Sequence, residues 1–327
     1  MRIFPRNFRC LACSVLAPFL LCLGLVAQAQ DFPSRPMRII VPYPPGGIPD
    51  PVTRVVAQSM SETLGQPIVV ENKLGGGGLP AVRDLQQSKP DGYTLLCLDN
   101  GMWALQPALR PGIYDPLKDF APVGTAVMST IFVTVNDSLQ VKTIQALVAL
   151  AKANPGKFSF GTSGVGTSHQ LLMETVKAHF GIDLVHVPYK GAASSAAALV
   201  AGEIPVVIAS MGTLAPHMKT GKIRRLLAST FRRSVFSPEV PGLGDVGIDN
   251  NFAGDIGYVA PGGTPRAVID KLAGALAKAV QTPEFAKRME GLFLEVSYRT
   301  PEQFEEAIRQ DVPRYARAVK LSGAKAE

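Results

Sequence analysis

The chain has 327 residues, of which 18% are charged and 46% hydrophobic, and its formal net charge is +7. This length is enough for one or two hydrophobic cores. A nucleic-acid-binding protein would need clustered lysine and arginine with interleaved aromatics, whereas only Arg224-Arg225 and Arg232-Arg233 form short basic pairs, so no nucleic-acid partner is expected. The mild positive charge suits an anionic small molecule instead.

The first segment of the chain is typical of a secretory signal peptide. Its basic residues are Arg2, Arg6 and Arg9. An apolar run at 11–26 follows, and Ala27-Gln28-Ala29 fits the small-residue site of signal cleavage. Because the apolar run is short for a membrane span, a signal peptide over residues 1–29, cleaved near Ala29, is predicted rather than a retained anchor. The mature protein is then expected in the periplasm, and losing the three arginines lowers its net charge from +7 to +4.

The cysteines predict a fold without disulfides. Three of them, Cys10, Cys13 and Cys22, lie in the segment to be removed, which leaves Cys97 alone. An exported protein without a disulfide must be held by its hydrophobic core. Cys97 follows the strand-like run 93–96, so a buried thiol is expected rather than a reactive one.

A loop rich in proline and glycine follows the first predicted strand, at 38–41. Pro42 ends this strand, and Asp50-Pro51 predicts an N-cap and the first residue of a helix. The buried face of that helix is expected to hold Val52, Val55, Val56 and Met60. Bare backbone beside a helix N-terminus is a geometry that binds anions, although an ordinary strand-to-helix turn has the same pattern.

Strands and helices alternate along the mature chain, which favours an α/β architecture with largely parallel sheets. The strands expected in the first half lie at 68–70, 93–98, 121–127 and 131–135, with helices at 80–87 and 143–153. Those expected further on lie at 158–160, 184–187, 204–209 and 226–228, with helices at 171–180, 194–201 and 215–220. A long connection is expected at 238–254, and Thr264-Pro265 and Thr300-Pro301 each begin a C-terminal helix.

A second glycine-rich loop, at 161–168, repeats the arrangement of the first. Its glycines expose backbone, and its serines and threonines add hydroxyl donors beside another helix N-terminus. We expect one α/β domain from residues 30–135 with 255–327 and a second from 136–254. The two loops would then face a cleft between the domains, a usual place for a small ligand.

Several stretches of the mature chain, in order, are similar to the receptors of tripartite tricarboxylate transporters, the Bug family of TctC-like proteins. They are 32–47 (FPSRPMRIIVPYPPGG), 64–73 (LGQPIVVENK), 89–96 (KPDGYTLL), 114–123 (YDPLKDFAPV), 161–169 (GTSGVGTSH), 185–191 (VHVPYKG) and 260–265 (APGGTP). This resemblance implies a type II periplasmic-binding-protein fold of two α/β domains that close on a small carboxylate. It also implies a monomer without a cofactor that delivers its ligand to membrane permease subunits. The carboxylate class stays open between a dicarboxylate, an aromatic carboxylate and an acidic amino acid.

The resemblance also implies which residues hold the carboxylate, through backbone N–H groups and hydroxyls. In the first loop they are Tyr43, Pro44, Pro45, Gly46, Gly47 and Ile48, and in the second Thr162, Ser163, Gly164, Val165, Gly166, Thr167, Ser168 and His169. Ile48-Pro49 departs from the more open form of the relatives, narrows the expected site and removes one donor. Asp255 is a further candidate, either facing a cationic group of the ligand or lying solvated in a loop.

Two alternatives stay open from the sequence. The first is an exported enzyme of the hydrolase type that uses Ser163 or Ser168 with His169, although the segment 161–165 lacks the final glycine of the G-x-S-x-G motif. The second is a sensory partner that binds the same ligand and signals. No nucleotide-binding motif is present, and the four histidines lack the spacing of metal ligands, so neither cofactor nor metal is expected.

Overall fold

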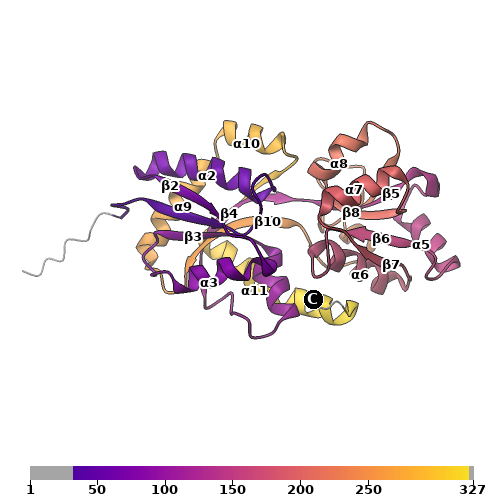
Figure 1. The fold of residues 1–327 in the computed structure, drawn as a ribbon, viewed down its shortest axis with the longest axis horizontal. Coiled ribbons are helices and arrows are strands. Elements are labelled where there is room, and N and C mark those ends of the chain that lie inside the picture. The colour runs from indigo at the N-terminus through magenta and orange to yellow at the C-terminus, as the bar shows by residue number, and fades with distance from the viewer. Residues whose placement is uncertain (1–31, 324–327) are drawn as a thin grey trace, which may run out of the picture. The chain divides into compact units, whose positions relative to one another are not determined.

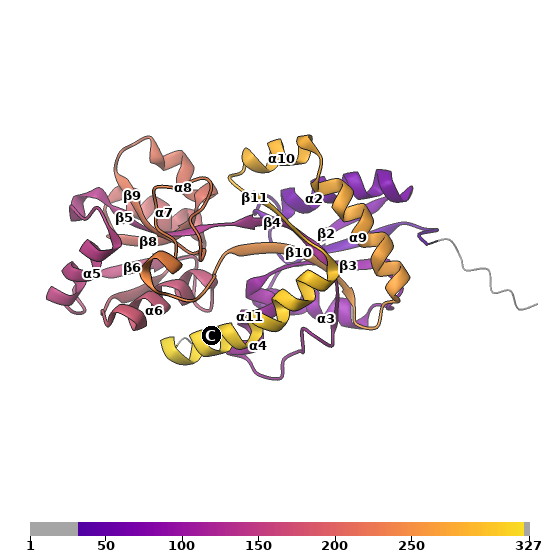
Figure 2. The ribbon, with the colours of Figure 1, turned by 180° about the vertical axis from the view of Figure 1, so that it is seen from behind.

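A computed structural model describes residues 32–323. The predicted signal peptide and its cleavage site lie outside these residues. Residues from 35 onward form a compact unit that contains two β-sheets with helices around them (Figures 1 and 2). Within residues 32–323, no helix combines the length and the apolar character that a membrane span requires.

The first sheet has six strands in the order β11-β4-β10-β3-β1-β2. Their bounds are β1 (Met37–Val41), β2 (Ile68–Asn72), β3 (Thr94–Asp99), β4 (Phe120–Ser129), β10 (Gly254–Pro261) and β11 (Glu295–Arg299). β1 runs parallel to β2 and β3, whereas β10 runs antiparallel to β3 and β4. In Figure 1 this sheet combines indigo and purple strands of the N-terminal part with an orange strand from late in the chain.

Helices from both ends of the chain surround this sheet. They are α2 (Pro49–Leu64), α3 (Leu79–Gln87), α4 (Gln106–Leu109), α9 (Arg266–Val280), α10 (Pro283–Glu290) and α11 (Pro301–Ser322), with short turns at η1 (Gly76–Gly78) and η2 (Gly101–Leu105). α2 packs beside α9, as both views show. α11 packs against β4 and η2, where Phe304 meets the ring of Trp103 edge-on at 5.0 Å between centroids. Both of these side chains are fully buried.

The second sheet has five strands in the order β7-β6-β8-β5-β9. Their bounds are β5 (Ile131–Asn136), β6 (Ser159–Thr162), β7 (Val185–Pro188), β8 (Val206–Ser210) and β9 (Ile223–Ala228). Its helices are α5 (Ile144–Ala153), α6 (Ser168–Phe180), α7 (Ala192–Ala201) and α8 (Met211–Met218), with short turns at η3 (Asp137–Leu139) and η4 (Gly244–Val246). β6 is parallel to β7 and β8, and β5 is antiparallel to β8 and β9.

The α/β fold class is confirmed, but the sheets are mixed rather than largely parallel. In the first sheet, β10 lies between β3 and β4 and runs in the opposite direction to β3. In the second sheet, β5 runs antiparallel to both of its neighbours, β8 and β9. β5 belongs to the second sheet, so sheet membership changes at Thr130 rather than after residue 135. The division into two domains at the expected bounds stays a prediction.

Local corrections are small. α2 begins at Pro49, and Asp50 therefore lies in its first turn instead of capping it. Cys97 is fully buried, as expected, and burial raises the pKa of its thiol to about 12. β10, β11 and α10 were not predicted from the sequence, although the structure has all three.

Candidate functional site

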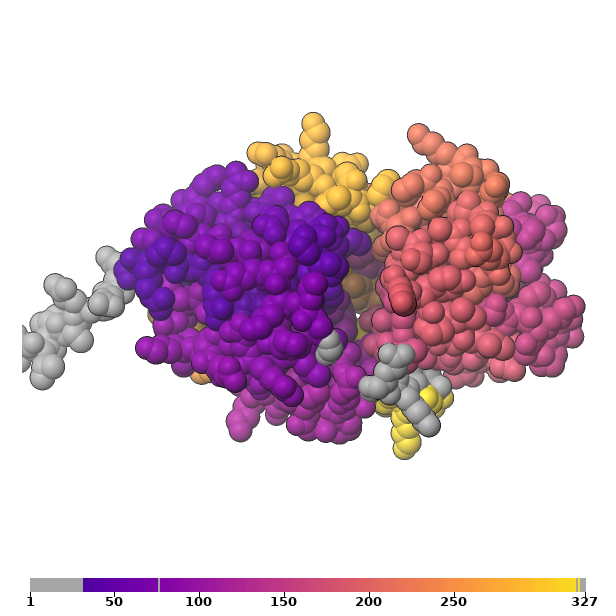
Figure 3. Space-filling model, in the orientation of Figure 1, coloured from indigo at the N-terminus to yellow at the C-terminus, as the bar shows by residue number. Residues whose placement is uncertain are grey.

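A cavity of about 500 Å³ lies where strands of both sheets end. The cavity is lined by residues after β1 (Pro42, Tyr43), after β2 (Gly75, Gly77, Gly78) and at the end of β3 and beyond it (Asp99, Asn100, Gly101, Met102, Leu105, Gln106). The remaining lining residues are Ile131, Ser163, Gly166, Thr167, Ser168, His169, Phe252 and Gly254. Figure 3 shows the surface hollowed between its purple and pink parts. Small ligands of α/β proteins commonly bind outside the carboxyl ends of strands, which is the position of this cavity.

In the first loop, Tyr43 lines the cavity, but Pro45, Gly46, Gly47 and Ile48 do not. The loop uses its own N–H groups: Gly46 N donates to Asp50 Oδ2 at 3.1 Å, and Gly47 N donates to the carbonyl of Pro44 at 3.0 Å. Ligand contacts by these four residues stay a prediction, and in this structure the glycine donors already have partners.

A polar cluster under this loop holds Tyr43 in place. Asn72 Nδ2 donates to the Tyr43 carbonyl at 3.0 Å and to Asp50 Oδ1 at 2.9 Å, and Arg54 pairs with Asp50 at 2.9 Å. Burial tends to raise the pKa of Asp50, but hydrogen bonds from Arg54, Asn72 and Gly46 outweigh it and hold that pKa below its ordinary value. Asp50 is therefore an ionised anchor of the loop at neutral pH.

The second loop contributes five of its expected residues to the cavity, from Ser163 to His169. Thr167 caps α6 by accepting a hydrogen bond from Gln170 N at 3.4 Å, and Gln170 Oε1 accepts one from Gly166 N at 2.8 Å. These bonds fix the loop against the first turn of α6. The N-terminus of that helix, which favours negative charge, therefore lies at the cavity.

Thr162, Gly164 and Val165 do not line the cavity, and Thr162 supports the loop from below. Its buried Oγ1 lies 2.7 Å from His186 Nε2 and accepts a hydrogen bond from Gly164 N at 3.2 Å. The His186 ring stacks on Phe160 with 4.9 Å between centroids. Burial, with the nearby charge of Lys177, lowers the pKa of His186 and favours its neutral form.

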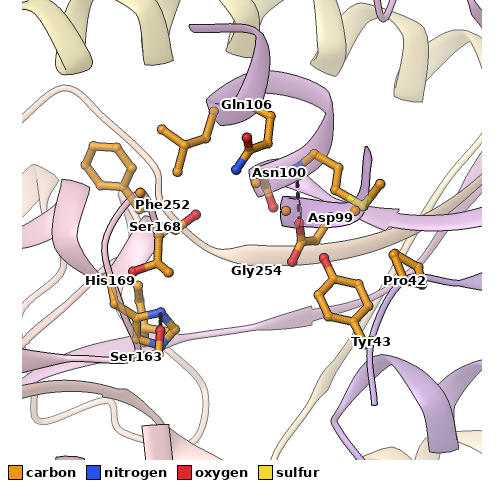
Figure 4. Close-up of a pocket in the computed structure, with 18 of the residues that line it drawn as sticks. Pro42, Tyr43, Asp99, Asn100, Gln106, Ser163, Ser168, His169, Phe252 and Gly254 are labelled. Atoms are coloured by element: carbon orange, nitrogen blue, oxygen red, sulfur yellow. Dashed lines mark hydrogen bonds between the residues drawn. The ribbon is translucent and has the colours of Figure 1, made fainter. Parts of the chain in front are cut away.

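Ser163 and His169 face the cavity as a hydrogen-bonded pair, with Ser163 Oγ 3.1 Å from His169 Nδ1 (Figure 4). Burial lowers the pKa of His169 to about 4, so its imidazole is neutral at neutral pH. His169 Nε2 is buried and has no hydrogen-bond partner within the described part of the chain. A serine–histidine nucleophile needs an orienting group on this second nitrogen, and the structure shows none among residues 32–323.

Asp99 lines the cavity but was not predicted as a site residue from the sequence. Its Oδ1 accepts a hydrogen bond from Met102 N at 3.2 Å, and its carboxylate also bonds the Tyr43 hydroxyl. Burial raises the pKa of Asp99 despite these bonds. The signal that could have found it is a polar Asp-Asn pair directly after the apolar strand at 94–98, since the carboxyl end of a strand is where such side chains reach a ligand.

Asp255 lies in β10 and is not among the residues that line the cavity. Its side chain is 3% exposed, and its Oδ2 pairs with Arg299 Nη1 at 2.7 Å. Its backbone N–H donates to Asn100 Oδ1 at 2.7 Å, which connects it to a residue of the cavity wall. A contact between Asp255 and a cationic group of the ligand stays a prediction.

The side chains that could bind a metal ion do not form a cluster in the described part of the chain. Across residues 32–323, no set of three or more His, Cys, Asp and Glu side chains is placed to hold a metal ion. The charged side chains that do come together instead form ion pairs, such as Arg299 with Asp255.

The chain matches the family model described as "Tripartite tricarboxylate transporter family receptor" over residues 52–323. It is 34% identical over 318 residues to "UPF0065 protein in gbd 5'region" of Cupriavidus necator, with 97% of each chain covered. It is 31% identical over 317 residues to "Protein BugT" of Bordetella pertussis, covering 95% of this chain and 97% of that protein.

Solved structures agree with these relatives. "Structure of a periplasmic transporter" is 36% identical with a TM-score of 0.77, covering 90% of this chain and 99% of the other. "R. palustris Rpa4515 with adipate" is 26% identical with a TM-score of 0.78, covering 90% and 99%. "MatC (Rpa3494) from Rhodopseudomonas palustris with bound malate" is 26% identical with a TM-score of 0.74, covering 88% and 100%.

The family model spans most of the chain, and both relatives exceed 30% identity over nearly their whole length. The sequence motifs, the α/β fold with its cavity at the strand ends, and these matches agree. The chain therefore belongs to the Bug family of periplasmic solute-binding receptors of tripartite tricarboxylate transporters.

Proposed function

We propose that this receptor binds a small organic solute through a carboxylate group in the cavity, in the periplasm, and delivers it to membrane permease subunits. The observation that carries the proposal is the loop from Ser163 to His169, whose hydroxyls line the cavity at the N-terminus of α6. Similar receptors with adipate and malate bound support a carboxylate as the ligand class.

The cavity is suited to a carboxylate through hydrogen bonds and a helix dipole, without a cationic side chain. Among the described residues that line it, none is a lysine or an arginine. Hydrogen bonds to a charged group contribute about 1.5–3 kcal/mol each, so two or three hydroxyl and N–H donors suffice to orient a carboxylate. Closure of the site around the ligand would add burial to this affinity.

The hydrogen bond between Ser163 and His169 is also a feature of serine hydrolases. A hydrolase is therefore the second candidate function. We favour binding without turnover, because the family is one of receptors and because no orienting group reaches His169 Nε2 within the described residues. Release of alcohol or acid from ester substrates by the purified protein would support the enzyme instead.

The ligand class is tested by native mass spectrometry of gently purified receptor, with a co-purified organic acid as the expected result. A thermal-shift panel then compares monocarboxylates, dicarboxylates, aromatic carboxylates and acidic amino acids. At least one class is expected to raise the melting temperature, since a ligand that binds the native state stabilises it. A panel without any shift, together with protein that carries no acid, would contradict the proposal.

Thr162→Val is expected to weaken binding of the best carboxylate from this panel roughly fivefold, or about 1 kcal/mol. Valine keeps the shape of the buried side chain but loses the hydrogen bonds to His186 and Gly164. The second glycine-rich loop is then held less firmly in its binding conformation. Isothermal titration calorimetry measures the change. Thr220→Val, at an exposed threonine after α8, is the matched control and should leave the affinity unchanged.

A further inference from the structure

The cavity contains one ionisable acid among its described lining residues, Asp99, at the carboxyl end of β3. Figure 4 shows Asp99 and Tyr43 on one side of the cavity, and Ser163, Ser168 and His169 on the other. The two sides of the cavity differ in the polar groups that a ligand could contact. The side of Ser163 has hydroxyls and a helix N-terminus, whereas the side of Asp99 has a carboxylate.

The Asp99 carboxylate has hydrogen-bond donors but no counter-charge at the cavity. Met102 N donates to its Oδ1 at 3.2 Å, and the Tyr43 hydroxyl bonds it as well. No lysine or arginine belongs to the described lining, and Asp99 takes part in none of the ion pairs within residues 32–323. A partly buried carboxylate without an opposite charge is costly, and a cation that reaches it removes that cost.

We propose that the natural solute carries, besides its carboxylate, an ammonium or another cationic N–H group that hydrogen-bonds Asp99. The proposal rests on the proposed function, because it takes the carboxylate to be held by the loop at Ser163. Asp99 is then the residue that selects amino-group-bearing carboxylates against dicarboxylates. A second carboxylate of the ligand would instead face Asp99 and be repelled by a like charge.

The pKa of Asp99 agrees with this geometry. Burial raises it although hydrogen bonds from the Tyr43 hydroxyl and from the backbone N–H groups of Met102, Gly101 and Asp99 itself act to lower it. The carboxylate therefore lacks the stabilisation that its ionised form requires. A bound cation would supply that stabilisation and would lower the pKa.

The test compares ligands of equal chain length that differ only in the second group. The full-length gene is expressed, the exported receptor is purified, and isothermal titration calorimetry is run with succinate, glutarate and adipate against β-alanine, 4-aminobutanoate and 5-aminopentanoate. L-aspartate and L-glutamate are added, since each carries an α-ammonium group on the succinate or glutarate skeleton. The same titrations are run on Asp99→Asn and on Asp270→Asn, which removes one carboxylate from the exposed face of α9 as a matched control.

The expected result is that the best amino-bearing ligand binds wild-type receptor at least tenfold more tightly than the dicarboxylate of the same skeleton. Asp99→Asn should abolish this preference or reverse it, and Asp270→Asn should keep it. Dicarboxylates that bind wild-type receptor as tightly as their amino counterparts would overturn the inference while leaving the proposed function in place. A preference that survives in Asp99→Asn would also overturn it.

The inference and the proposed function fail in different ways. If no ligand of either class binds wild-type receptor, the role of Asp99 is overturned, and the carboxylate assignment is overturned as well only when the wider thermal-shift panel also gives no shift and the protein carries no acid. The wild-type comparison needs no variant, so it can overturn the inference even if Asp99→Asn does not fold.

Discussion

Replacing Arg299 by alanine is expected to lower the free energy of unfolding by about 3 kcal/mol. Arg299 Nη1 lies 2.7 Å from Asp255 Oδ2, and the Asp255 side chain is only 3% exposed. The other oxygen, Asp255 Oδ1, is buried without a hydrogen-bond partner in the part of the chain that the structure describes. Removing the guanidinium leaves this buried carboxylate without its counter-charge, which is the costly way to break an ion pair.

Chemical denaturation of wild type, Arg299→Ala and the double variant Asp255→Asn with Arg299→Ala measures this effect. The double variant is expected to regain most of the loss, because a neutral amide needs no counter-charge. Arg309→Ala is the matched control on α11: Arg309 pairs with Glu305 at 2.8 Å, but both side chains are more than half exposed. An exposed pair of this kind contributes at most about 0.5 kcal/mol.

The effect of Arg299→Ala should also depend on pH. Burial raises the pKa of Asp255 in the folded protein even though Arg299 acts to lower it, so removing Arg299 raises that pKa further. A raised folded-state pKa means that the native state takes up a proton more readily than the unfolded chain, whose aspartates titrate near pH 3.9. The destabilisation is therefore present at neutral pH and shrinks as the pH falls through the folded-state pKa. A loss that is equal at pH 7 and pH 4 would instead indicate packing of the arginine stem.

Elements with local signals were predicted from the sequence. Thr300-Pro301 begins α11 as expected, and Thr300 forms a capping box with Gln303. The strand β10 carries no such signal, because Gly254, Gly257 and Pro261 give it the composition of a loop. Its strand geometry comes from hydrogen bonds to β3 and β4, which are distant in sequence. Pairing of this kind is decided by tertiary packing and not by local propensity.

In the candidate site, too, the orientation of single side chains depends on tertiary contacts that the local sequence does not predict. The glycine-rich pattern located both loops, and Tyr43 and five residues of the second loop do line the cavity. Whether the Gly46 N–H is free to bind a ligand depends on the orientation of the Asp50 side chain. In the structure this N–H donates to the Asp50 carboxylate. The Asp99-Asn100 pair at the end of an apolar strand was the sequence signal for Asp99, but only the fold shows that this acid lies opposite the second loop.

Ser163→Ala is expected to weaken carboxylate binding roughly thirtyfold, or about 2 kcal/mol, since the hydroxyl would donate directly to a charged group. The Ser163 hydroxyl can do so only if it does not donate to His169, whose Nδ1 lies 3.1 Å away. The imidazole tautomer with its proton on Nδ1 meets this condition, because Nδ1–H then donates to Ser163 Oγ and leaves the serine proton for the ligand. His169→Leu removes this orientation and is expected to cost less, about fivefold.

A double-mutant cycle by calorimetry separates these two roles, because His169 acts through Ser163 and the losses should then not add. Ser194→Ala, at an exposed serine of α7, is the matched control and should leave the affinity unchanged. Burial lowers the pKa of His169 to about 4, so titration of His169 should not change the affinity of wild type between about pH 8 and pH 5.5. Fully additive losses, or an affinity that changes through pH 6.5 only while His169 is present, would show that the imidazole touches the ligand itself and that Ser163 is not the donor it orients.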